Sequence, residues 1–267
     1  KAADQMGVKL KVFNITEEYL EVVKKPKYGY GKNMNPCIDC RIFMFKIAKQ
    51  YMQETCAGFI VTGEVLGERP MSQRMDAIKI IERESGLSGF ILRPLSARLF
   101  PPTVPEKTGI IDREKLLNLS GRSRKPQLRL AKEIGINDYP CPSGGCLLTD
   151  QNFSLRLKDL MTHDNLNVGN AKLLKIGRHF RLSKTARLIV GRDDMENKAL
   201  MSFFGNSDII LRCESFAGST ALLKGDINDE IINLSAMINA YFSKGKQEEK
   251  VSVLYSNYGC SDEFIVK

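Results

Sequence analysis

The chain has 267 residues, of which 43% are hydrophobic and 27% charged, a composition typical of a folded protein with room for two domains. Its 40 Lys and Arg residues outnumber its 31 Asp and Glu residues, and the resulting charge of +9 favours either a polyanionic partner such as RNA or a solubilising surface. No apolar run is long enough to cross a membrane and the first residues are not a signal peptide, so we expect a cytoplasmic protein without a membrane partner.

The first 24 residues are predicted to form a helix, a strand and a second helix. Residues 10–15 alternate apolar and polar side chains, as a half-buried strand does, and Thr16 is expected to cap the helix after it. A loop then leads to a cysteine pair, and a long helix is expected from Arg41. Its predicted buried stripe consists of Phe43, Ile47, Ala48 and Tyr51.

Short apolar runs at residues 59–62 and 90–92 are predicted to be strands, the first a buried parallel strand between two glycines. Residues 63–73 would leave the end of that strand, where open α/β sheets bind ligands. Helices are expected over residues 114–119 and 126–134. This alternation predicts an α/β fold, a parallel sheet with helices on both faces.

After Asp150 the pattern changes to that of a small α+β domain. A helix is predicted at residues 153–161 and another at 229–242. Strands are predicted at residues 173–177, 187–191, 208–212, 220–223 and 251–255. We therefore predict two domains, residues 1–160 and 165–267.

Cysteines mark the candidate site. Cys37 and Cys40 are two residues apart, a spacing with which two sulfurs can share a metal or cluster or exchange a disulfide. The distant sequence Pro-Cys-Pro-Ser-Gly-Gly-Cys at residues 140–146 can supply a third thiolate. We prefer Cys146 to Cys141, because the two glycines before Cys146 allow a close backbone approach. An iron–sulfur cluster, a reversible disulfide and a structural zinc ion remain open.

Other residue types argue against different chemistries. The seven cysteines are an odd number, which argues against a fully paired disulfide framework and favours a reducing compartment. His163 and His179 are the only histidines and neither has ligand-like neighbours. A histidine-based triad or metal site is therefore not expected.

Several motifs, taken in order, resemble the PP-loop tRNA thiolases, most closely the tRNA 4-thiouridine synthases. These motifs are the cysteine pair with residues 41–48, Thr-Gly-Glu-Val-Leu-Gly at 62–67 followed by Ser72-Gln73, Arg93-Pro94-Leu95, and Ala-Lys-Glu-Ile-Gly-Ile at 131–136. Gly145-Cys146 with residues 153–156 is similar to the second catalytic cysteine loop of the wobble-uridine 2-thiouridylases.

This resemblance implies a Rossmann-like PP-loop domain that uses ATP with Mg²⁺ to adenylate a uridine oxygen of tRNA, which sulfur then replaces. It implies nucleotide contacts at Arg41, Gly63 and Gln73. It also implies catalytic roles for Cys37, Cys40 and Cys146, as carriers of a persulfide or as ligands of a [4Fe-4S] cluster with an open iron for sulfide. The sulfur donor would be a cysteine desulfurase or sulfide, and the product 4-thiouridine or, alternatively, 2-thiouridine.

One departure from the family concerns ATP. The family's Ser-Gly-Gly-x-Asp-Ser pyrophosphate loop follows its first strand, and no segment of this sequence supplies it. Residues 143–146, Ser-Gly-Gly-Cys, lack the Asp-Ser and lie too late in the domain. We expect the first strand and the loop to precede Lys1, and we expect the chain as it stands to bind ATP weakly or not at all.

The second half resembles the RNA-binding domain of NFACT-type ribosome quality-control proteins, over residues 189–200, 208–211, 218–219, 233–236 and 240–243. Candidate RNA contacts are residues 122–132 and a second basic cluster, with Phe180 available to stack on a base. That cluster consists of Arg178, His179, Arg181, Lys184, Arg187 and Arg192. The competing interpretation of both is a solvated basic face.

We therefore predict an ATP-dependent tRNA sulfurtransferase. One alternative is a non-catalytic RNA-binding or ribosome-associated factor with a structural or redox cysteine site. Another is a desulfurase or PP-loop ligase that acts on a substrate other than RNA. A homodimer is left open.

Overall fold

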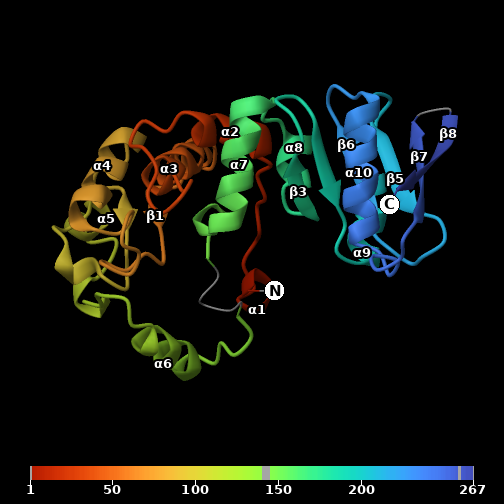
Figure 1. Cartoon of the computed structure of the whole chain (residues 1–267). Coiled ribbons are helices and arrows are strands. Elements are labelled where there is room, and N and C mark those ends of the chain that lie inside the picture. The colour runs from red at the N-terminus through yellow and green to blue at the C-terminus, as the bar shows by residue number, and fades with distance from the viewer. Residues whose placement is uncertain (1, 140–144, 258–259, 267) are drawn as a thin grey trace. The chain divides into compact units, whose positions relative to one another are not determined.

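A computed structural model describes residues 2–139, 145–257 and 260–266. It divides the chain into two compact units, Lys1–Asp150 and Gln151–Lys267 (Figure 1). In the described part of the chain, no helix combines the length and the apolar character needed to cross a membrane.

The first unit is mainly helical around a small parallel sheet. Its helices are α1 (Ala2–Gln5), α2 (Thr16–Lys24), α3 (Cys37–Glu54), α4 (Met75–Ser85), α5 (Val104–Lys107) and α6 (Lys125–Glu133), with 3-10 turns at Ala97–Leu99, Arg113–Lys115 and Leu147–Thr149. Strands β1 (Ile60–Val61) and β2 (Ile91–Leu92) pair in parallel, Ile60 beside Ile91. The predicted parallel pairing is confirmed, but within the described residues the sheet has two strands rather than a broad layer covered on both faces.

The core of this unit lies between α3 and α4. Ile38, Ile42 and Phe45 of α3 are buried and pack against an apolar group from α4, the turn after it and β2. That group consists of Ala77, Ile81, Leu87 and Ile91. The predicted stripe of α3 was wrong. Ile47, Ala48 and Tyr51 line an apolar groove of about 430 Å³ beside Phe13, and the Phe43 ring lies 6.1 Å from that of Tyr19.

Three local predictions in this unit were also wrong. Residues 10–15 form no strand, and the side chains of Leu10 and Val12 are 72% and 75% exposed. Thr16 does not cap α2, because the Asn14 side chain accepts the Thr16 backbone N–H at 3.3 Å. Residues 116–119 are extended rather than helical, since backbone N–H groups there donate to the carbonyls of Pro94 and Leu95, both at 2.8 Å.

The second unit is an antiparallel sheet with helices, as the α+β prediction required. Its elements are α7 (Gln151–His163), α8 (Val168–Leu173), β3 (Arg178–Arg181), β4 (Arg187–Val190), α9 (Asp194–Met201), β5 (Ile209–Cys213), β6 (Thr220–Lys224), α10 (Asp229–Tyr241), β7 (Val251–Asn257) and β8 (Cys260–Val266). The strand order is β3-β4-β6-β5-β7-β8.

Both faces of this sheet are covered. Leu188, Val190 and Leu211 point to the face under α10, whereas Ile189, Ile210 and Leu222 point to the face that meets Leu173 of α8 and Leu200 of α9. The central strands are therefore buried on both sides, which explains their nearly continuous apolar sequences.

Polar residues start the helices of this unit. The side chains of Asn167, Asp193 and Asn228 each accept a backbone N–H in the first turn of α8, α9 and α10. The predicted strand at 173–177 was wrong, because the chain from Asn167 is a capped helix that ends at Leu173. Sequence analysis also missed β3, β8 and α9.

Candidate functional site

The cysteine pair lies in the first turn of α3 and not in a loop before it, which corrects the predicted start of that helix at Arg41. Asp39 accepts the backbone N–H groups of Lys27 and Tyr28 at 2.9 and 3.0 Å, so the preceding loop folds back onto the helix. Buried Asn35 donates its side-chain amide to Cys37 Sγ at 3.3 Å. A helix N-terminus carries positive partial charge, which favours the thiolate form of a cysteine placed there.

The segment that carries Cys146 returns to this turn. Met34 N–H donates to the carbonyl of Leu148 at 3.2 Å, and the Asn33 side chain donates to the carbonyl of Thr149 at 2.7 Å. The Thr149 hydroxyl in turn donates to the carbonyl of Cys146 at 2.6 Å. Two segments more than 100 residues apart in the sequence are thus held side by side.

Cys37, Cys40 and Cys146 lie close enough for their charges to interact. Cys146 is exposed, and the other two are partly buried. Cys141 lies outside the described residues. Among the residues described, no three His, Cys, Asp or Glu side chains form a group that could hold a metal ion. The structure therefore brings the three thiols into one neighbourhood without arranging them as ligands.

Tyr19 of α2 belongs to this neighbourhood, and sequence analysis did not single it out. Burial raises the pKa of Tyr19 far above its usual range, and a hydrogen bond to Cys40 and the charges of the three cysteines add to the rise. Burial also raises the pKa of Cys40, while the hydrogen bond from Tyr19 and the charge of Arg41 oppose that rise. Cys40 is therefore a protonated thiol at neutral pH, and Tyr19 is the neighbour that most favours its ionisation.

A buried chain of ion pairs lies behind the cysteine turn. Glu64, 2% exposed, follows β1, forms an ion pair with Arg41 Nε at 3.1 Å and accepts a hydrogen bond from Arg93 Nε at 3.0 Å. Arg93, 3% exposed, also pairs with Glu82 of α4 at 2.5 Å and packs on the Phe100 ring at 5.5 Å. Two carboxylates and two guanidinium groups thus tie α3, β1, β2 and α4 together.

The three residues implied in nucleotide binding occupy different settings. Gly63 is exposed at the carboxyl end of β1, with open space where a side chain would begin. The guanidinium of Arg41 is engaged by Glu64. Gln73 is 3% exposed, and its side-chain oxygen accepts Arg69 N–H at 2.9 Å, which closes the loop at residues 67–73. Gly63 alone presents an unobstructed surface to a ligand.

Helix α6 carries the first of the two predicted basic stretches. It has no buried residue, and Lys125, Arg129 and Lys132 lie at spacings of four and three, on one face. All three side chains are exposed, and none forms an ion pair with a residue that the structure describes. Arg124, just before the helix, is held by Glu68 at 2.9 Å. The exposed side chains form an unneutralised cationic stripe.

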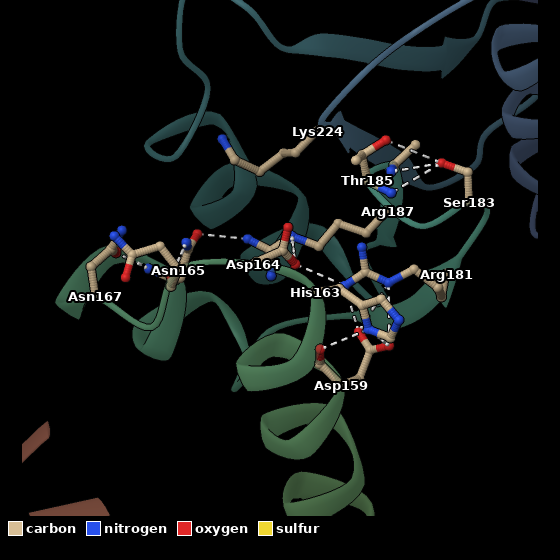
Figure 2. A network of polar contacts seen from close by, with 12 residues as sticks. Asp159, His163, Asp164, Asn165, Asn167, Arg181, Ser183, Thr185, Arg187 and Lys224 are labelled. Carbon is tan, nitrogen blue, oxygen red and sulfur yellow. Dashed lines mark hydrogen bonds and ion pairs between the residues drawn. The ribbon is translucent and has the colours of Figure 1, made fainter. Parts of the chain in front are cut away.

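Three of the six residues of the second basic cluster are paired with carboxylates inside the second unit, and Figure 2 shows two of them, Arg181 and Arg187. Arg181 binds Asp159 at 2.6 Å and Asp164 at 2.7 Å. Arg187 has a side chain that is 6% exposed, and it donates to Asn170 at 2.6 Å. Arg192 pairs with Glu196. Arg181 and Arg187 are therefore engaged in contacts within the fold, whereas Arg192 stays about half exposed beside Glu196, and their contact with RNA stays a prediction.

His179 does not contribute positive charge either. Its Nε2 lies 2.8 Å from the carbonyl of Ile176. Burial, together with the charges of Arg156 and Arg187, lowers the pKa of His179 to about 4, so the ring is neutral at physiological pH. Of the predicted cluster, Arg178, Lys184 and Arg192 remain exposed, and Arg192 is paired with Glu196.

Comparison with known proteins assigns each unit a separate similarity. Residues 2–98 match the family described as thiamine biosynthesis protein (ThiI), and residues 177–267 match the NFACT protein RNA binding domain. Each match covers well under half of the chain. No curated protein matches the sequence.

One solved structure is similar over most of the chain. It is the C-terminal part of the fibronectin/fibrinogen-binding protein from Streptococcus suis, with 15% identity and a TM-score of 0.32 over 86% of this chain and 85% of that one. This level of likeness does not establish a common fold.

Replacing Glu64 with Gln should destabilise the protein by about 3 kcal/mol, because two arginines would lose a buried carboxylate partner. The matched control is Glu114→Gln, since Glu114 is 79% exposed and pairs with Arg98 at 3.1 Å. That change should cost less than about 1 kcal/mol. Thermal unfolding of the full chain followed by circular dichroism measures both, and equal losses would contradict the assigned role of Glu64.

Cys40 should react with iodoacetamide more slowly than exposed Cys56 at pH 8, because a raised pKa leaves less thiolate. The rate at Cys40 should rise as pH approaches its elevated pKa. Tyr19→Phe removes the hydrogen bond that lowers this pKa and should move the profile to still higher pH. Peptide mass spectrometry measures both sites in one sample, and a shift toward lower pH in Tyr19→Phe would refute the assignment.

Proposed function

We propose that this chain is a tRNA sulfurtransferase of the uridine-thiolating type, with sulfur chemistry in the first unit and RNA binding in the second. The proposal rests on one observation: segments distant in sequence place Cys37, Cys40 and Cys146 in one neighbourhood, within a unit whose first part matches the ThiI family. The match of residues 177–267 to an RNA-binding domain supports RNA as the substrate class.

The chemistry replaces a uridine carbonyl oxygen with sulfur. ATP with Mg²⁺ would adenylate that oxygen and so make it a leaving group. A persulfide on Cys146, loaded by transfer of sulfane sulfur from a cysteine desulfurase, would then attack the ring carbon and release AMP. Cys37 or Cys40 would next attack the Cys146 sulfur, which releases the thiouridine and leaves a protein disulfide for a dithiol reductant to reduce.

The surroundings of the cysteines suit these roles. Cys146 is the exposed member, as a sulfur carrier that must meet an RNA base should be. Cys37 and Cys40 occupy the start of a helix, where the positive end stabilises the thiolate that forms. Tyr19 and Arg41 also favour the ionised form of Cys40. Cys40 is thus held protonated until reaction, and Tyr19 and Arg41 stabilise it when it ionises.

In a second version of the chemistry, the three thiolates would hold a [4Fe-4S] cluster, and the iron without a protein ligand would bind sulfide. Cysteine thiolates are the usual ligands of iron–sulfur clusters, so three thiols from two segments are a suitable set of ligand types. In the structure, the described residues form no group of three ligands that could hold a metal ion.

Gly63 would approach the nucleotide at the end of β1, where the backbone is open. Gln73 would act indirectly, by holding the loop at residues 67–73 in shape. Arg41 would act mainly on the cysteines, because Glu64 engages its guanidinium.

A second candidate function is a non-catalytic RNA-associated factor with a redox-active cysteine site. It is favoured by the engagement of Arg41 and Gln73 within the protein, which leaves one of the three implied nucleotide contacts open. The two candidates differ in whether RNA bound to the chain acquires sulfur.

Cys146→Ala should abolish formation of thiolated uridine, since both versions of the chemistry require this sulfur. Cys56→Ala is the control, because Cys56 is also exposed but has no assigned role. The readouts are thiolated nucleosides in tRNA, by mass spectrometry from cells that carry each variant as their only copy, and iron content of protein purified without air. Retained thiolation in Cys146→Ala would exclude both versions, while unthiolated tRNA with the unaltered protein would favour the non-catalytic factor.

Arg129→Gln and Lys132→Gln should each weaken RNA binding by the full chain and reduce the salt dependence of the affinity by about one charge. The control is Lys115→Gln, because Lys115 is 82% exposed in the same unit but lies beside Asp112 at 3.5 Å. Filter binding of tRNA across a range of salt concentrations measures the slope. An unchanged slope in both α6 variants would remove this helix from the interface.

A further inference from the structure

We propose that Arg178, Phe242 and Tyr241 form a stacking site for an unpaired nucleobase of RNA, which we call the β3–α10 platform. The inference rests on the RNA-binding function proposed above and assigns it to one surface of the second unit. The ligand class is single-stranded RNA, since the bases of a duplex are already stacked on each other.

The two faces of strand β3 make different contacts. His179 and Arg181 face the segment that contains Asp159 and Leu174. Because side chains alternate along a strand, Arg178 and Phe180 lie on the opposite face, where the ring centres of Phe180 and Phe242 are 5.9 Å apart. Because β3 is an edge strand of the sheet, this second face lies at the margin of the domain.

Three side chains build the platform from the core outward. Phe242, just after α10, packs against the main core of the unit, which fixes its ring. The guanidinium of Arg178 lies 4.7 Å from the centre of that ring. Tyr241 meets Phe242 edge to face at 5.2 Å, yet it is 67% exposed. A rigid base therefore supports an exposed aromatic ring beside a planar cation.

The charge on Arg178 distinguishes it from its basic neighbours. Arg181 and Arg192 are both paired with carboxylates, as described above. Arg178 has no carboxylate within ion-pair distance among the residues that the structure describes, and its closest polar contact is the carbonyl of Gly191 at 3.5 Å. An exposed, unneutralised guanidinium over an aromatic ring suits a nucleotide, which offers a base to stack and a phosphate to bind.

The balance of charges in the matched region also points to stacking. Residues 177–267 contain as many acidic as basic residues, so the region has no net positive field to hold RNA. Affinity for RNA in such a region must come from local contacts, and exposed aromatic rings supply the strongest contacts to unpaired bases.

Two apolar side chains, Leu234 and Met237, lie on the same face of α10 as Tyr241. They are 41% and 46% exposed. A protein partner or a second copy of the chain would use this apolar stripe as a whole. A nucleobase would use only its end, where Tyr241 meets Phe242 and Arg178. This difference provides the matched control for the test.

The test compares the full chain and its variants on one fluorescein-labelled RNA, single-stranded and then annealed to its complement, by fluorescence anisotropy. Tyr241→Ala should weaken single-strand binding about tenfold and leave duplex binding unchanged. Tyr241→Phe should retain single-strand affinity, because the ring is kept. Met237→Ala, one turn earlier on the same face, should have no effect, and circular dichroism should confirm that each variant is folded.

Each outcome has a distinct meaning. Failure of the unaltered chain to bind either RNA would overturn the proposed RNA-binding function and the platform with it. Single-strand binding that Tyr241→Ala leaves intact would overturn the platform alone. Equal effects of Tyr241→Ala and Met237→Ala, or a change in oligomeric state in both, would identify the stripe as a protein interface and exclude the platform.

Discussion

The first unit depends on one carboxylate buried between two guanidinium groups. Glu64 leaves the end of β1 and contacts Arg41 of α3 and Arg93 at the end of β2, so it joins elements that a two-residue strand pair could not hold in register. Ionised groups in an interior are tolerated only when they are well paired, which makes the geometry of this contact strict. The orientation of the first turn of α3, and with it the position of the cysteines, follows from that contact.

Sequence patterns predicted the second unit better than the first, and the reason is physical. Strands β4, β5 and β6 are buried on both faces and α10 is long and periodic, so their apolar residues follow the rules that pattern analysis uses. Residues 10–15 alternate just as clearly, but no strand among the described residues pairs with them and Val12 stays exposed. The predicted strand at residues 173–177 is the end of α8 and a turn, in which the N–H of Ile176 donates to the carbonyl of Leu173. Its apolar residues are buried because they pack against the sheet, not within it.

Sequence patterns predicted the cysteines of the candidate site, but they did not predict the residues that surround those cysteines. The cysteines and their glycines are visible in the sequence. The return of residues 147–149 to this turn depends on hydrogen bonds from the Asn33 side chain and the Met34 backbone to the carbonyls of Thr149 and Leu148, which no sequence pattern encodes. Tyr19 was missed because a single tyrosine in an amphipathic helix carries no signal. The second basic cluster misled for a similar reason, since the carboxylates that neutralise Arg181 lie about 20 residues earlier in the sequence. Most of the chain's excess positive charge lies in residues 1–150, away from the region that matches an RNA-binding domain.

The pairing of Arg181 with Asp159 and Asp164 limits how the second unit can be dissected. The similarity to an RNA-binding domain begins at residue 177, but both carboxylates and the buried Leu173 come before it. A fragment trimmed to the region of similarity would strip Arg181 of its counter-ions and uncover apolar surface. The RNA affinity of such a fragment would include a contact by the unpaired Arg181 that the intact chain, in which Asp159 and Asp164 hold this side chain, does not make.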